Sequence, residues 1–129
     1  MLPTMTAIIP TPWSSDNSVP IDVEQALEAI QNSRRRHVLV ILDDVESPHS
    51  VSDLAEAIAV IELDKDIPEL DAQQRKNVYI ALTQHHLDIL DALGAISYEE
   101  RSKQVHATDA TAGLADLVRH VESVCEGSS

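Results

Sequence analysis

The feature that most constrains the fold is a long helical pattern between Asp71 and Gly94. No proline or glycine interrupts residues 72–93. One stripe of this segment carries Val78, Leu82, His85, Ile89 and Leu93 at helical spacing. Asp71 with Gln74 has the form of a capping box, and Gly94 stands where a glycine commonly follows a helix end. The pattern predicts one helix over 72–93, about 33 Å long at ~1.5 Å per residue.

Three shorter helical patterns precede it, at 21–32, 33–45 and 52–63. Asp22 with Gln25 predicts a capping box for the first, Ser52 is the expected cap of the third, and ESPHSV (46–51) is expected to be a turn. The residues expected to face the core are Val23, Ala26, Leu27 and Ile30; Val38, Leu39, Leu42 and Val45; and Leu54, Ala55, Ile58 and Ile61.

The pattern changes after Gly94. Apolar residues alternate around the polar EERSK, at Ile96, Tyr98, Val105 and Ala107, which predicts a β-hairpin over 95–108. Three helices followed by a hairpin is the order of a winged helix-turn-helix. We therefore expect a mostly α fold with a small β-hairpin: an extended N-terminal arm (1–19), a winged-helix domain (20–108) and an extra C-terminal helix (109–129).

The C-terminal segment has a narrow apolar seam with 3-4-3 spacing, at Leu114, Leu117, Val121 and Val124. Two interpretations remain open from the sequence. The seam can pack on the core of its own domain, or it can pack against its twin in a homodimer. We expect the second, because the helix follows the winged-helix unit.

The net charge of −13, from 22 acids against 9 Lys and Arg, also needs an explanation. Acidic chains with few aromatic residues can be disordered, but the strong periodicity argues against that here. A dense carboxylate surface also keeps a folded protein soluble at very high salt, which indicates a halophilic protein. The alternative is a surface for a basic protein partner, or a mimic of DNA.

Several motifs together resemble one family. They are NSRRRHVLVILDD, SVSDLAEAIA and LDAQQRKNVYIALTQHHLDILDALGAISYEERSKQV, which span most of 26–107. In combination they resemble the haloarchaeal winged-helix domain family of unknown function, whose members are predicted to be DNA-binding transcription regulators. The resemblance implies a winged-helix fold and binding to duplex DNA, and it fits a protein of a halophilic archaeon. A cytoplasmic location is expected separately, because the single Cys125 allows no disulfide framework within the chain. The nine-residue connector 62–70 is longer than the usual three- or four-residue turn.

The charge distribution agrees with that expectation. Residues 72–108 contain four cations and four acids, so the whole negative charge lies elsewhere. A helix N-terminus with nearby cations suits a phosphate, and Asn and Gln suit adenine edges in the major groove. The expected DNA contacts are Gln73, Arg75, Lys76, Asn77, Thr83 and Gln84 on the helix, with Ile80 beside them, and Arg101 and Lys103 in the wing. The alternative is a solvated helix face.

The cluster Arg34–Arg36 gives two further candidates, Arg34 and Arg35. Three adjacent helical residues point about 100° apart, so one or two are expected to bind phosphate and the rest to form ion pairs. The alternative is a structural cluster of ion pairs. His85 and His86 are adjacent, whereas helical metal ligands need i,i+4 spacing, so no metal site is predicted.

The sequence shows no phosphate loop or nucleophile–base pair, and hence no enzyme and no cofactor is expected. It has no apolar run of ~18 residues and no secretory signal at its start, so no membrane span is expected.

Overall fold

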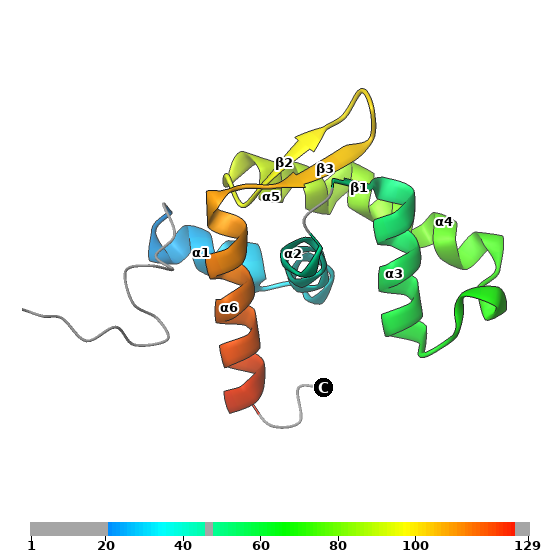
Figure 1. Cartoon of the computed structure of the whole chain (residues 1–129), viewed down its shortest axis with the longest axis horizontal. Helices are drawn as coiled ribbons and strands as arrows, with labels where there is room; N and C mark the ends of the chain where they lie inside the picture. Colours follow the sequence, from blue (N-terminus) through cyan, green and yellow to red (C-terminus); the bar gives the residue numbers. More distant parts are fainter. Residues whose placement is uncertain (1–20, 46–47, 126–129) are drawn as a thin grey trace, which may run out of the picture.

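Helices and strands follow a winged-helix-like order in the computed structural model, which describes residues 21–45 and 48–125 (Figure 1). The described part begins with α1 (Val23–Ile30) and α2 (Ser33–Asp44), followed by β1 (His49–Ser50) and α3 (Val51–Leu63). After the short 3-10 turn η2 (Ile67–Glu69) come α4 (Ala72–Ala81), η3 (Leu82–His86) and α5 (Leu87–Ala92). It closes with β2 (Ile96–Glu99), β3 (Gln104–Ala107) and α6 (Asp109–Val124). The predicted class, mostly α with a small hairpin and an extra C-terminal helix, is confirmed. The predicted arm 1–19 lies outside the described residues.

The sheet has three antiparallel strands in the order β1-β3-β2. The predicted hairpin is present, with Ile96 opposite Ala107 and Glu99 opposite Gln104. Sequence analysis missed β1, whose His49 pairs with Val105, because two residues are too short to show alternation. The cap predicted at Ser52 is wrong, since the side chain of Ser50 accepts the hydrogen bond from the Asp53 amide.

The long helix is continuous, but its middle segment η3 is a π-helix. The capping box at its start is confirmed, since Asp71 and Gln74 exchange hydrogen bonds of 2.8 and 3.0 Å. A π turn accommodates one more residue than an α turn. The buried stripe therefore shifts by one position, from the predicted His85 and Ile89 to His86 and Leu90. His85 is exposed, and Ile89 and Leu93 are only half-buried.

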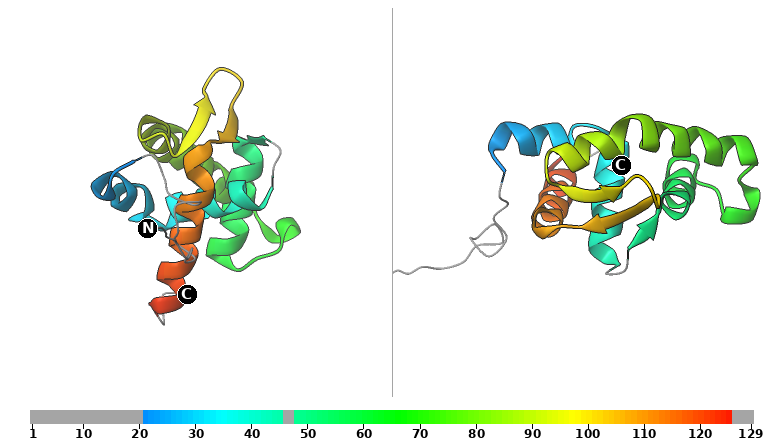
Figure 2. Two further views of the ribbon diagram at one scale, coloured as in Figure 1. Left: turned by 60° about the vertical axis from the view of Figure 1, so that its left-hand side comes forward. Right: turned by 90° about the horizontal axis from the view of Figure 1, so that it is seen from above.

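The core lies where α2, α3, α5, α6 and the sheet meet, and α6 belongs to it. Figure 2 shows α6 beside α2, against which it packs. Leu114 is fully buried, so predicting it as a contact between subunits is wrong, and the helix does not lie outside the domain. Leu117 and Val121 are partly buried against the same core, whereas Val124 is 65% exposed. Spacing alone cannot distinguish a core helix from an interface helix.

Four other residues predicted to face the core are exposed. Helix α1 buries Ala26, Ala29 and Ile30, and a helix this short presents only part of its apolar stripe to its neighbours. The residues left exposed are Val23 at 73%, Leu27 at 56%, Val45 at 43% and Ile61 at 51%. Val45 and Ile61 lie at or near the C-terminal ends of α2 and α3, where the packing against the core ends.

Candidate nucleic-acid interface

The outward face of α4 and η3 carries amide side chains at helical spacing. Gln73, Asn77 and Gln84 are exposed, and Ile80 lies among them with 37% of its surface accessible. The side-chain amide of Gln73 donates to Asn77 Oδ1 at 2.7 Å, which shows that these two side chains share one face. The structure therefore places the predicted amide side chains and Ile80 on an accessible surface.

This face lies in an acid-free part of the chain. No Asp or Glu occurs from Ala72 to Leu87, and the next acids are Asp88 and Asp91 in α5. Asp91 accepts a hydrogen bond of 3.0 Å from the Tyr98 amide, so its carboxylate binds the base of the hairpin. The acids that border this stretch are therefore Asp71, whose carboxylate caps the helix, and Asp88.

The two adjacent cations of α4 differ in their partners. Arg75 lies 3.3 Å from Glu56 of α3, and its Nη2 donates to the carbonyl of Ile67 at 3.3 Å. Lys76 is exposed and forms no ion pair with any described residue. Of these two predicted phosphate contacts, Lys76 is therefore the one whose charge is uncompensated.

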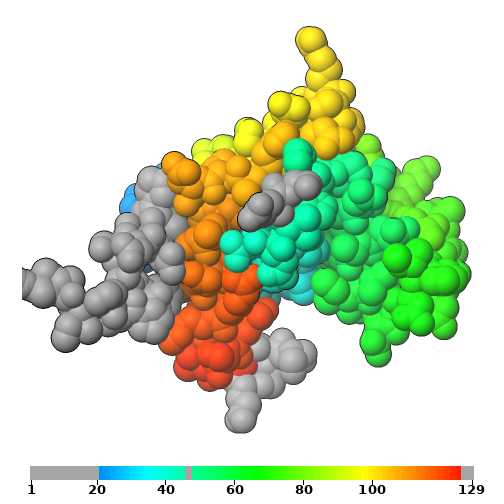
Figure 3. All heavy atoms as spheres, viewed as in Figure 1, coloured from blue at the N-terminus to red at the C-terminus, as the bar shows by residue number. Residues whose placement is uncertain are grey.

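The predicted wing residues lie at the turn between β2 and β3, which projects from the body of the molecule in Figure 3. Arg101 is exposed and Lys103 is half-buried with a left-handed backbone (φ 57°). Neither forms an ion pair within the described part of the chain. The carbonyl of Lys103 accepts from the Val51 amide at 3.0 Å, so the turn is tied to the start of α3.

Thr83 differs from the other predicted contacts. Its hydroxyl donates to the carbonyls of Tyr79 and Ile80, at 3.1 and 3.2 Å. Hydroxyls of Ser and Thr commonly bond back to the preceding helical turn in this way. The hydroxyl proton of Thr83 is therefore engaged within the helix, and only the oxygen can accept a bond from outside.

The arginine cluster is structural, so the prediction of Arg35 as a DNA contact is wrong. Arg35 is 3% exposed, and its Nη2 donates to the Glu28 carbonyl at 2.9 Å. Arg36 likewise donates to the Ile30 carbonyl at 2.6 Å. Both side chains satisfy carbonyls in the last turn of α1, which has no basic residue of its own. Burial lowers the pKa of Arg35.

Arg34 is also engaged, although it lies at the surface. Its guanidinium makes a two-pronged contact with Glu62 of α3, at 2.7 and 2.9 Å. These hydrogen bonds raise the pKa of Arg34. The contact joins the start of α2 to the end of α3, so this charge is already compensated.

A feature that the sequence did not reveal is a pocket of about 310 Å³ between α3 and α4. Ser52 and Ala55 line it from α3, and the residues lining it from α4 are Ala72, Arg75, Lys76 and Tyr79. The spacing of the four α4 residues is helical, but nothing in the sequence shows that Ser52 and Ala55 lie opposite them.

Other kinds of site find no support within the part of the chain that the structure describes. No three His, Cys, Asp or Glu side chains there could hold a metal ion together. His85 and His86 meet edge to face, with ring centroids 4.9 Å apart, and only His86 is buried. None of the helices in 21–45 and 48–125 has the length and apolar character needed to cross a bilayer.

Comparison with known proteins gives a family but no activity. Neither a curated protein nor a solved structure matches this chain. One family profile matches residues 27–106, from α1 to the last strand of the sheet. The chain belongs to that family, which is described as a domain of unknown function (DUF7344).

Proposed function

We propose that this protein is a transcription regulator that binds duplex DNA through the outward face of α4 and η3 and through the β2–β3 turn. The observation that carries the proposal is the distribution of compensated and uncompensated cations. Of the nine Lys and Arg, Arg34, Arg75 and Arg119 pair with carboxylates, and Arg35 and Arg36 donate to carbonyls. Lys65, Lys76, Arg101 and Lys103 have no such partner among residues 21–45 and 48–125.

Three of these four uncompensated cations lie on the long helix and the turn of the hairpin. In a chain with 22 acids, a lysine without a carboxylate partner leaves positive charge available to an external anion. Lys76 supplies it beside the exposed amides, and Arg101 and Lys103 supply it at the projecting turn. DNA phosphates are bound by such cations, which position a reader without specifying sequence.

The amide side chains of the same face suit base recognition. The major groove, about 12 Å wide, admits a helix, and Asn and Gln form two hydrogen bonds with an adenine edge. Gln73 and Asn77 occupy successive turns of the exposed face, and Gln84 lies two turns further along it. The exposed amides of the long helix and the cations of the β2–β3 turn thus support a DNA-reading helix flanked by a phosphate-binding wing.

The wider proposal places the regulator in the cytoplasm of a halophilic archaeon, as a homodimer on two half-sites. The composition supports a high-salt setting, because carboxylates are abundant and the net charge is −13. Among the seam residues, Val124 is exposed and can meet a second copy, as can Val23 and Leu27 of α1. Dimeric readers of DNA bind half-sites about one helical turn apart.

The test is fluorescence anisotropy of the purified protein with random-sequence and genomic duplexes, in ~0.5 to 3 M KCl. Lys76→Gln and Arg101→Gln should each weaken binding, and light scattering on the same sample gives the mass. Lys65→Gln is the matched control, because Lys65 is also uncompensated but lies on the connector before α4. Equal effects of all three substitutions would refute the proposed interface.

One observation favours a different class, an acidic protein-interaction module. Ile80 lies in the middle of the proposed reading face with 37% of its surface exposed, and an apolar residue there suits a protein partner. Absence of DNA binding at every salt concentration, by a protein with its full helical circular dichroism signal, would favour this alternative.

A further inference from the structure

The pocket between α3 and α4 is a consequence of small residues at facing positions. Ser52 and Ala55 of α3 oppose Ala72 of α4, and none of these side chains is long enough to fill the space between the helices. Ala55 is 2% exposed, so the pocket reaches the packed interior, and Tyr79 forms part of its wall. Its volume of about 310 Å³ lies at the lower end of the range for ligand sites, ~300–1,000 Å³.

Polar groups gather at one side of this pocket. Arg75 Nε lies 3.3 Å from Glu56 as an ion pair without hydrogen-bond geometry, and Nη2 donates to the carbonyl of Ile67. Both Nε and Nη1 are left without a hydrogen bond among the described residues. Lys76, one residue later, has no carboxylate partner. Ser52 adds a hydroxyl. With Arg75, Lys76 and Glu56 all ionised, the local charge is +1, which a single negative charge compensates.

We propose that this pocket binds a small organic monoanion with a flat apolar body, of the class of aromatic carboxylates. The carboxylate would lie between Lys76 and the free edge of Arg75, since charged donors form the strongest hydrogen bonds to carboxylates. The body would cover Ala55 and Ala72 and contact the ring of Tyr79. An inorganic oxyanion could bind to the two cations but would leave the apolar wall of the pocket in contact with water.

This inference goes beyond DNA binding and does not require it. Lys76 lines the pocket and also belongs to the proposed DNA interface, so a bound carboxylate would compensate the charge that a DNA phosphate needs. Ligand and DNA would then compete, and the pocket would be an effector site. Binding to the pocket is measured on the protein without DNA, so its failure is distinguishable from failure of the proposed function.

The experiment is a titration of ¹⁵N-labelled protein with sodium benzoate at constant ionic strength, followed by amide chemical shifts. We expect a dissociation constant on the order of 1 mM for so small a probe. The shifts should concentrate at Ser52, Ala55 and the α4 residues of the pocket. Benzamide, which has the same ring and no charge, should bind at least roughly tenfold more weakly, in line with ~1.5 kcal/mol for a charged hydrogen bond.

Two variants make the outcome decisive. Ala72 is exposed and lines the pocket, so Ala72→Leu fills the pocket with a larger side chain and leaves both cations in place. This variant should abolish the benzoate-induced shifts. Lys76→Gln should weaken benzoate about tenfold, whereas Lys65→Gln, outside the pocket, should leave it unchanged. Equal binding of benzoate and benzamide, shifts elsewhere on the molecule, or unaltered binding by Ala72→Leu would each overturn the proposal.

Discussion

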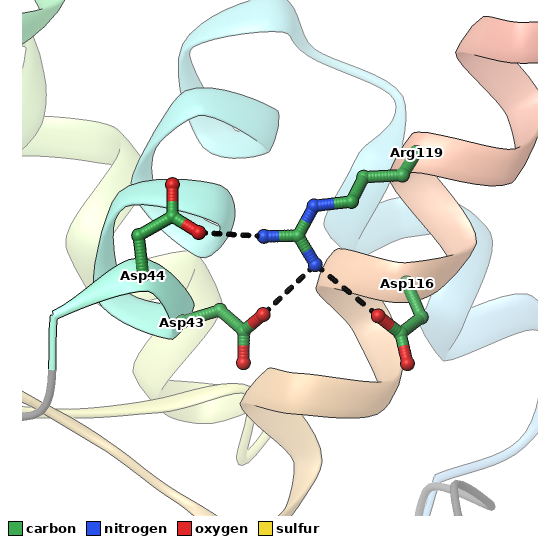
Figure 4. A network of polar contacts seen from close by, with 4 residues as sticks. All are labelled: Asp43, Asp44, Asp116 and Arg119. Carbon is green, nitrogen blue, oxygen red and sulfur yellow. Dashed lines mark hydrogen bonds and ion pairs between the residues drawn. The ribbon is translucent and has the colours of Figure 1, made fainter.

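Arg119 Nη1 of α6 lies 2.8 Å from Asp43 Oδ2 of α2, 76 residues earlier in the chain (Figure 4). The same guanidinium contacts Asp44 at 3.0 Å and Asp116 at 3.1 Å, so one cation compensates three carboxylates. Hydrogen bonding to Asp43 raises the pKa of Arg119. The contact joins the two helices that form much of the core, and it keeps three acids of a highly acidic chain close together.

Replacing this arginine should therefore destabilise the domain. Arg119→Gln leaves the three carboxylates without their shared cation, and we expect a loss of about 1 kcal/mol, because the side chain is 39% exposed and solvent screens the interaction. Urea unfolding followed by circular dichroism measures it. The uncompensated Arg101→Gln is the matched control and should change stability by less than ~0.5 kcal/mol. Equal stabilities of the two variants would show that the cluster contributes nothing.

Thr111 of α6 is hydrogen-bonded to the base of the hairpin, and loss of its hydroxyl should lower the free energy of unfolding by more than Arg119→Gln does. This buried hydroxyl donates to the Ala95 carbonyl at 2.7 Å and accepts from the Thr108 amide at 2.8 Å. Thr111→Val keeps the shape but leaves both backbone groups unsatisfied, which costs roughly 1–3 kcal/mol. Thermal and urea unfolding should show it, against an exposed control, Ser123→Ala, that stays within ~0.5 kcal/mol. A near-neutral Thr111→Val would mean that water replaces the hydroxyl.

His86 should make folding sensitive to mild acid. Burial, followed by the charges of His85 and Arg35, lowers the pKa of His86 from 6.5 to about 4. Because the folded pKa is the lower one, the unfolded chain binds more protons between pH 6.5 and 4. The contribution of this residue is therefore fully favourable above pH 6.5 and is lost as the pH falls toward 4. Between pH 7 and 5 the loss should be roughly 2 kcal/mol.

The difference between wild type and His86→Leu isolates this effect from the carboxylates, which titrate in both proteins. The free energy of unfolding of wild type relative to the variant should fall as the pH drops from 7 to 5. Gln84→Ala, at an exposed and uncharged position nearby, is the control and should follow the wild type. A pH-independent difference between wild type and His86→Leu would mean that His86 titrates normally.

Local patterns predicted the elements well. The capping boxes at Asp22 and Asp71, the helix between Ala72 and Leu93 and the hairpin depend on residues near in sequence, so their signals are visible in one chain. The one-residue shift of the buried stripe was not predictable, because the π turn depends on packing across the core. Periodicity predicts which residues share one face of a helix, but it cannot predict how that set of residues shifts after a π turn.

The site was predicted only in part, for a related reason. The exposed amides, Lys76 and the cations of the wing could be chosen by position on a helix or in a turn. Whether a cation is compensated depends on residues far away, as Glu62 for Arg34 and the α1 carbonyls for Arg35 demonstrate. Charge counting therefore could not separate Lys76 from the paired Arg34 and Arg75, and it could not identify Arg35 as a buried cap.

The adjacent cations Arg75 and Lys76 allow the proposed DNA binding to be tested through its salt dependence. If Lys76, Arg101 and Lys103 each contact one phosphate, the slope of log K against log[KCl] should be about −3 per protomer, since each contact contributes about −0.9. Lys76→Gln should bring it to about −2. Arg75→Gln should leave the slope nearly unchanged, because Glu56 already compensates Arg75.

A shallow slope has a physical consequence for a protein with a charge of −13. Binding that depends on few phosphate contacts loses little affinity as salt rises, so hydrogen bonds from Gln73, Asn77 and Gln84 would supply most of the specificity. Anisotropy titrations at four KCl concentrations give the slopes of wild type and both variants. A wild-type slope steeper than about −5 per protomer, or equal changes on removing Arg75 and Lys76, would show that the compensated arginines also leave their partners to bind DNA.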